Sequence, residues 1–120
     1  MKIQSSIIRD TIELTDANGD ILKSIPFTVN CTQVWKKANI IRAEISKIES
    51  NDIDHFGELA EQLFRVIFGD AVTDELIQFY DGDFVCIVTD CAVILNDLVY
   101  PAFNRIAEQN LNARKAMKNR

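Results

Sequence analysis

The most apolar part of the chain reads FVCIVTDCAVILNDLVYPAF, residues 84–103. A transmembrane helix needs about 20 apolar residues, so a membrane span has to be weighed against a buried helix. Asp90 and Asp97 interrupt the run, and a central aspartate costs roughly 2.5–3.5 kcal/mol on insertion into a bilayer. We therefore expect a helix at the centre of a soluble domain and no association with a membrane.

This central helix is predicted to cover 83–112 and to bend near its middle. At 100° per residue its apolar side chains span an arc of about 180°, which is typical of a helix with neighbours on several sides. Pro101 lacks a backbone N–H, and its ring clashes with the preceding turn, so it predicts a kink. Three aspartates recur every seven residues and should lie on one edge of the helix: Asp83, Asp90 and Asp97.

Three shorter helices are predicted before it, over 32–49, 52–68 and 73–80. Apolar residues recur at steps of three and four in the first of them. The second has an N-cap candidate within Ser50-Asn51-Asp52 and a stop signal in Gly69. Its apolar arc is wider than one neighbour would cover. Thr73 is the expected N-cap of the third helix.

The N-terminal part predicts a β-hairpin over 7–29. Apolar and polar residues alternate in two runs, as in strands with one buried face. The Asn18–Gly19 pair between them tolerates the positive φ that a tight hairpin turn requires. Lys23 falls on the apolar face close to the turn, where its amine can reach water. Pro26 cannot donate to a strand ladder and suggests an edge position.

These patterns predict an α+β fold. A chain of 120 residues allows one domain of ordinary size, and we expect a single domain over 1–120. An isolated hairpin is marginal in water, so it must pack on the helices. The expected architecture is an N-terminal β-hairpin packed on a bundle of about four helices, of which the last is long and kinked.

Charge is divided unevenly along the sequence. The net charge is −5, which disfavours a protein that binds a phosphate backbone. Residues 49–97 hold twelve acids and one base, or −11, whereas the remainder holds twelve bases and six acids, or +6. The acidic block either attracts a basic partner segment or forms a solvated surface. Nucleic-acid binding is unlikely because the terminal bases are few and interrupted, namely Arg114, Lys115, Lys118 and Arg120.

No residue pattern predicts an enzyme, a cofactor or a metal site. His55, the only histidine, lies in the first turn of a predicted helix, where a positive imidazolium is disfavoured. The hairpin turn resembles the start of an EF-hand loop, but Ile21 occupies the position of the required glycine. The chain has no Gly-rich phosphate loop and no hydrolase motif. The chain has an odd number of cysteines, which does not indicate a disulfide framework. We expect them to be small apolar residues of a protein in a reducing compartment: Cys31, Cys86 and Cys91.

Two short motifs carry a family resemblance. The run Phe79-Tyr80-Asp81-Gly82 joins the last two predicted helices, and Val99-Tyr100-Pro101 lies near the end of the second. Within residues 74–106 the chain resembles the small tail assembly chaperones of long-tailed phages and prophages of Gram-positive bacteria. In that family an aromatic pair, an acidic residue or Asn, and a Gly form such a turn, and a "Val or Ile, any residue, Pro" step follows.

The resemblance implies a function without catalysis. Such chaperones bind the tape measure protein, a long and mostly helical apolar chain, and keep it soluble until tail tube protein polymerises around it. They act in the bacterial host cytoplasm and are not expected in the mature virion. The alternative is a structural or adaptor component of the phage tail, which would remain in the particle.

Seven residues are candidates for partner contact. The aromatic candidates are Trp35, Phe64, Phe68 and Tyr80, and the acidic candidates are Asp83, Asp90 and Asp97. The alternative for the aromatics is an ordinary role in the core. Because the apolar arcs of the 52–68 and 83–112 helices are wide, we also expect that the chain can form a homo-oligomer.

Overall fold

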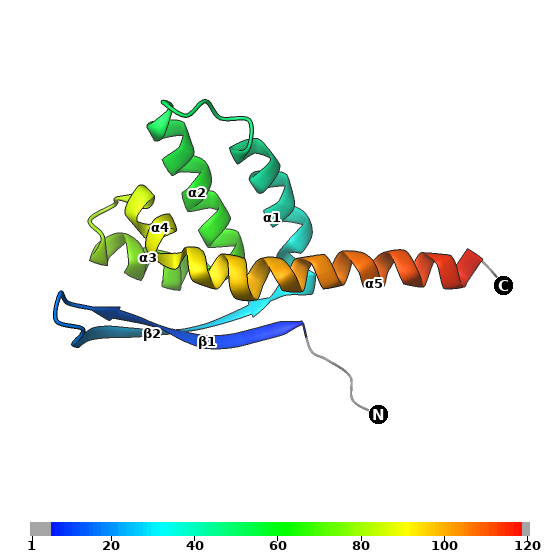
Figure 1. Cartoon of the computed structure of the whole chain (residues 1–120), viewed down its shortest axis with the longest axis horizontal. Coiled ribbons are helices and arrows are strands. Elements are labelled where there is room, and N and C mark those ends of the chain that lie inside the picture. Colours follow the sequence, from blue (N-terminus) through cyan, green and yellow to red (C-terminus); the bar gives the residue numbers. More distant parts are fainter. Residues whose placement is uncertain (1–5, 119–120) are drawn as a thin grey trace.

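Two strands come first in the fold and helices follow. The computed structural model describes residues 6–118; residues 1–5 and 119–120, with Arg120 of the basic tail, lie outside the described part. The elements in chain order are β1 Ile7–Thr15, β2 Ile21–Asn30, α1 Cys31–Ile45, α2 Ile53–Phe68, α3 Asp70–Phe79, α4 Phe84–Ile94, a π-helical turn η1 Leu95–Val99, and α5 Tyr100–Lys118. Figure 1 shows the hairpin along one side of the molecule, with α1 and α2 on the other side of α5. This arrangement confirms the predicted α+β class with its N-terminal hairpin and long final helix.

The hairpin has one apolar face and one polar face. β1 and β2 pair antiparallel, with Ile12 opposite Ile25. Because side chains alternate between the two faces of a sheet, this register gathers the apolar residues on the helix side. The buried residues of that face are Ile12, Leu14, Ile25, Phe27 and Val29.

Pro26 interrupts no hydrogen bond of the ladder. The Cys31 N–H donates to the Ser6 carbonyl at 3.1 Å, just beyond the strands. Hydrogen-bonded and non-hydrogen-bonded pairs of residues alternate along an antiparallel ladder. Since Ser6 and Cys31 form a hydrogen-bonded pair, counting along the register makes Thr11 and Pro26 a non-hydrogen-bonded pair. The position without an N–H therefore faces away from β1, as predicted for an edge.

The predicted turn is present at the tip of the hairpin. Gly19 has a φ of 85°, and a carboxylate oxygen of Asp16 accepts a hydrogen bond from the Asn18 N–H at 2.8 Å. Beyond the turn, the Lys23 amine lies 3.7 Å from a carboxylate oxygen of Glu75 on α3. Lys23 therefore reaches past the edge of the apolar face and pairs with a helix, while its side chain stays partly exposed.

A chain of four aromatic rings joins the hairpin to the helices. Phe27 of β2 meets Phe68 of α2 edge-on, with ring centroids 5.3 Å apart. Phe68 contacts Phe64 at 5.4 Å, and Phe64 meets Phe84 of α4 edge-on at 6.1 Å. Both faces of α2 are thus covered, by the hairpin and by α4, which accounts for its wide apolar arc.

α1 ends four residues earlier than predicted. The helix stops at Ile45, where the Ser46 hydroxyl donates to the Ala43 carbonyl at 2.7 Å. Serine side chains that bond to nearby backbone offer the chain an alternative to further helix. α2 begins and ends within one residue of the prediction, and a carboxylate oxygen of its N-cap Asp52 accepts from the His55 N–H at 3.2 Å.

The N-terminus of α3 was predicted wrongly. Gly69 adopts a φ of 87° and lets the chain turn from α2 into α3 within one residue, so α3 starts at Asp70. Thr73 is therefore inside the helix, fully buried, and its hydroxyl donates to the Gly69 carbonyl at 2.8 Å. The corner is held by Arg65, whose guanidinium lies 3.1 Å from Asp70 and 2.8 Å from Asp74.

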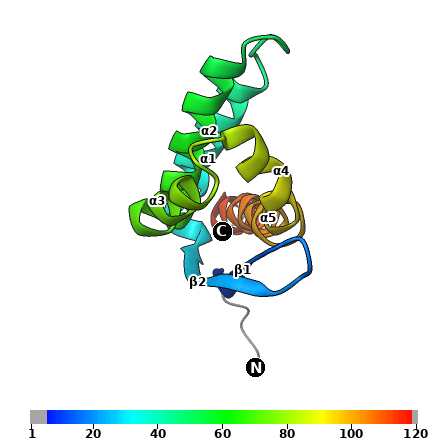
Figure 2. The same cartoon turned by 90° about the vertical axis from the view of Figure 1, so that its left-hand side faces the viewer.

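The kink predicted at Pro101 takes the form of a π-helical turn. Leu95–Val99 form this wider turn immediately before Pro101, and bends in long helices are commonly found at proline and at π-bulges. α4 is turned away from the axis of α5 (Figures 1 and 2). Because a π-helical turn holds more residues than an α-helical turn, a spacing of seven no longer keeps side chains on one edge of the helix. Asp97, which lies in this turn, is therefore out of line with Asp83 and Asp90.

By length and composition alone, Phe84–Lys118 could cross a membrane. The core helix of a soluble protein meets the same criterion. Ile87, Leu95 and Val99 are buried in the core of this fold. The absence of membrane contact stays an expectation from the sequence.

The aromatic chain gives a test of the fold. Phe27→Ala should lower the free energy of unfolding by about 3–5 kcal/mol, because it removes the ring that fixes the hairpin to α2. Its control is Thr28→Ala, at the next position of β2 on the exposed face, which should stay within about 0.5 kcal/mol of the wild type. Urea denaturation followed by circular dichroism measures both. Equal losses for the two variants would contradict this packing.

Candidate functional site

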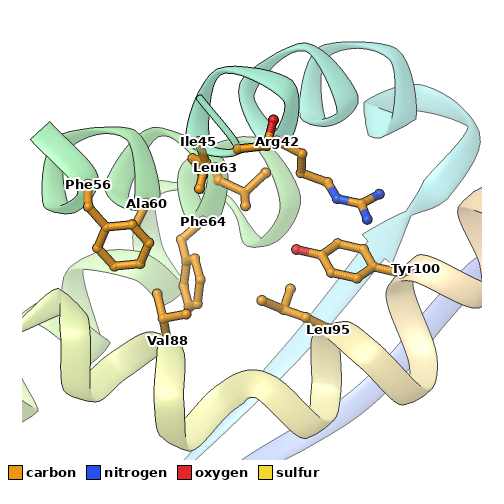
Figure 3. Close-up of a pocket in the computed structure, with 10 residues that line it drawn as sticks. Arg42, Ile45, Phe56, Ala60, Leu63, Phe64, Val88, Leu95 and Tyr100 are labelled. Atoms are coloured by element: carbon orange, nitrogen blue, oxygen red, sulfur yellow. The ribbon is translucent and has the colours of Figure 1, made fainter. Parts of the chain in front are cut away.

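An apolar cavity of about 210 Å³ lies between α2 and α4. Figure 3 shows side chains from α1 and α2 on one wall and from α4 and η1 on the other. The α2 wall consists of Phe56, Ala60, Leu63 and Phe64, and Val88 and Leu95 face it. An apolar cavity of roughly 150 Å³ already admits benzene, so this one can hold an aliphatic or aromatic side chain.

A cation–π contact closes one end of the cavity. The Arg42 guanidinium lies over the Tyr100 ring, 3.6 Å from its centroid, and an Arg42 nitrogen donates to Asn39 at 3.0 Å. Burial raises the pKa of Tyr100, and the positive charge of Arg42 partly offsets that rise. Tyr100 thus stays a neutral phenol at physiological pH, and the pair forms an amphipathic rim.

Two further hollows lie near the cavity, and adjacent ones share lining residues. The first, about 390 Å³, shares Ile45 and Phe56 with the cavity, and the second, about 310 Å³, shares Ile53 and Val85 with the first. Because neighbouring hollows share these lining residues, we treat the three as one surface along α2 and α4 and call it the acidic groove. Ile53 is 62% exposed and Val85 46% exposed, so its open part offers apolar surface to a partner.

Acidic side chains line the open part of this groove, which gives it its name. They are Glu49, Asp52, Asp54, Glu58, Glu61 and Asp83. Glu61 pairs with Arg65 at 3.2 Å, and Asp52 lies 3.6 Å from the exposed His55. Within residues 6–118 no Lys or Arg pairs with the other four. The groove therefore combines an apolar floor with a strongly negative rim.

Asp83 has a structural role as well as a place in the rim. It is the N-cap of α4, and its carboxylate accepts from the backbone N–H and from the thiol of Cys86, both at 3.2 Å. These two hydrogen bonds lower the pKa of Asp83. Its negative charge is therefore fixed over the whole physiological range.

A second groove, of about 560 Å³, separates β1 from α4. Two residues that line this groove are joined by a hydrogen bond: the Tyr80 hydroxyl donates to an Asp90 carboxylate oxygen at 2.9 Å. Burial, together with this hydrogen bond, raises the pKa of Tyr80. We call this second groove the β1–α4 groove.

The seven predicted contact residues do not form one site. Asp83 lies in the acidic groove, and Tyr80 with Asp90 in the β1–α4 groove. Phe64 is fully buried and reaches only the wall of the cavity. The remaining three are apart from both grooves: Trp35 is half-buried on α1, Phe68 is buried, and Asp97 is exposed on η1.

Phe68 requires a correction. Its ring is enclosed by Phe27 and Phe64, so it offers no surface to a partner in this fold. The ordinary core role, which was the alternative from the sequence, applies to Phe68.

Sequence reasoning missed the residues that make the acidic groove. Val85 was placed in the apolar arc of its helix and Ile53 was not singled out, and both side chains are exposed in the structure. Gly57 was not singled out at all. An available signal was the close spacing of Ile53, Asp54, Gly57 and Glu58, which combines apolar, acidic and small residues at one end of a helix.

No metal-binding geometry is found in the part of the chain that the structure describes. There, no three His, Cys, Asp or Glu side chains are arranged to hold a metal ion. Compared with known proteins, the chain matches no family model, no curated protein and no solved structure.

The β1–α4 groove gives a test at alkaline pH. Burial is the main cause that raises the pKa of Cys91 from 9.0 to about 11, so the folded state holds this proton more tightly than the unfolded chain. The contribution of the neutral Cys91 thiol to the free energy of unfolding is fully present below pH 9.0 and is lost as the pH rises towards 11. The free energy of unfolding should fall by about 2–3 kcal/mol more in the wild type than in Cys91→Ala over that interval.

Urea denaturation at a series of pH values measures this difference. Tyr80 and Tyr100 remain in both proteins, so the greater part of their titration is common to the two curves. Cys91 contributes to the raised pKa of Tyr80 only after burial and the hydrogen bond to Asp90. Parallel pH curves for the two proteins would refute a buried neutral thiol.

Proposed function

We propose that this protein is a phage tail assembly chaperone that binds and solubilises the tape measure protein, with a helical segment of that client in the acidic groove. The observation that carries the proposal is an apolar floor next to an acidic rim in which four of the six acids have no Lys, Arg or His partner within residues 6–118. The short motifs at Phe79–Gly82 and Val99–Pro101, which resemble that family, support it independently. The groove accounts for the binding step, and the resemblance supplies the identity of the client.

The apolar floor suits an amphipathic helix. Helix-in-groove recognition uses apolar anchors at steps of three and four residues. The cavity beside Phe56 and Val88 takes one anchor side chain, and the hollow at Ile53 and Val85 takes the next. Full burial of one such aliphatic or aromatic side chain contributes about 1.5–3 kcal/mol. Two anchors give a moderate affinity, which fits a client that has to be released.

The acidic rim serves the complex in a different way. A client with long apolar faces aggregates unless its complex carries charge of one sign. Asp54, Glu58 and Asp83 supply that charge beside the bound segment. The same rim favours clients with basic residues next to the apolar anchors.

Co-expression tests the proposal. The chain should keep the tape measure protein of its own phage or prophage in the soluble fraction and co-purify with it. The double variant Ile53→Ser with Val85→Ser removes exposed apolar surface from the groove, so the soluble yield of client should fall several-fold. Because both side chains are substantially exposed, the fold should lose little stability.

The matched control is Val93→Ser. Val93 is also an exposed valine on α4, but it lies in the β1–α4 groove. The Val93→Ser variant should solubilise the client as well as the wild type does. Equal loss in the control would place the client outside the acidic groove, and no rescue by the wild type would refute the chaperone function.

Mass spectrometry of purified particles tests the alternative role. A chaperone should be absent from finished tails. Stoichiometric presence there would favour a structural or adaptor component.

A further inference from the structure

The last three turns of α5 project from the body of the protein. Every residue from Ala107 to Lys118 is exposed, and Figure 1 shows this segment extending beyond the other elements. We call residues 107–118 the arm. A helix of about 12 residues without tertiary contacts is marginal in water, so the arm would gain stability from a binding surface.

The arm carries the charge opposite to that of the acidic groove. It holds Arg114, Lys115 and Lys118 against one acid, Glu108. Leu111 is 52% exposed, and with Arg114 and Lys118 it follows steps of three and four, so these side chains form one line along the helix. The line starts apolar and ends basic.

We infer that the arm of a second copy of this chain occupies the acidic groove. The apolar start of the arm then faces the cavity end of the groove, and its basic end faces Asp54 and Glu58. These two acids are exposed and have no Lys or Arg partner within residues 6–118. Figure 1 shows the arm extending away from α2 and α4, the helices that line the groove, so the arm can reach only the groove of another copy.

The lengths of arm and groove agree. At 1.5 Å per residue the arm is about 17 Å long. The residues of α4 and η1 that line the acidic groove lie between Asp83 and Leu95, which are about 18 Å apart along the helix on the same basis.

Gly57 is a second observation that points to a partner. It lies inside α2, where glycine is unfavourable, and it lines the open hollow of the groove. A Cβ atom at this position would meet no heavy atom within 4 Å. The packing within this chain therefore gives no reason for a glycine, whereas a helix laid in the groove would approach the backbone closely there.

This inference does not depend on the proposed function, because self-association needs no client. Arm and client would compete for the same groove. The arm would cover the apolar floor while no client is present.

A charge swap tests the inference on the full-length chain. The arm variant carries Arg114→Glu, Lys115→Glu and Lys118→Glu, and the groove variant carries Asp54→Lys and Glu58→Lys. All five positions are exposed, and circular dichroism checks that each variant is folded. Sedimentation velocity and light scattering give the dissociation constant of self-association at low salt.

The wild type should self-associate in the micromolar range, and more weakly as salt is added. Each variant alone should bind itself at least about tenfold more weakly, because like charges then face each other. An equimolar mixture of the two should recover association, since acidic arms then meet basic grooves and basic arms meet acidic ones. Gly57→Leu should also weaken association, without any change of charge.

The control variant is Arg9→Glu with Lys36→Glu and Lys37→Glu. It changes the net charge as much as the arm variant does, at exposed positions away from the groove, and should associate like the wild type. A monomeric wild type, unaffected charge variants, a mixture that stays monomeric, or a control that fails equally would each overturn the inference.

Discussion

The contact between Phe64 and Phe84 sets the distance between α2 and α4, and the rest of the structure depends on that distance. Phe64 meets Phe84 on one side and Phe68 on the other, so α2 is joined at once to α4 and, through Phe27, to the hairpin. Edge-on aromatic pairs add about 0.5–1.5 kcal/mol beyond the area they bury. With α4 held at this one contact, the remaining space between the helices is the cavity and the groove that continues from it.

The elements that could be predicted from the sequence were those with local causes. Asn18 and Gly19 define the hairpin turn, Asp52 and Gly69 delimit α2, and Pro101 marks the bend. Thr73 was misplaced because a single left-handed residue at Gly69 lets one helix follow another directly. No local rule foretold the π-helical turn before Pro101.

The site was harder to predict because it depends on which apolar surfaces cover one another. Phe68 and Ile53 belong to the same helix and to the same apolar pattern, yet the hairpin covers one and nothing covers the other. Likewise, Glu61 and Glu58 look alike in the sequence. Only the position of Arg65, which already pairs with Glu61 of α2 and with acids of α3, shows that the single base of the acidic block is unavailable to the other acids of the rim.

The projecting arm also changes how the size of this protein should be judged. The Cα radius of gyration is 16.5 Å, whereas a compact chain of this length is expected near about 14 Å. A single molecule therefore diffuses more slowly than a sphere of equal mass, and it elutes early from a gel-filtration column. Elution volume alone would overstate the number of subunits, and the frictional ratio has to be separated from the mass before any stoichiometry is assigned.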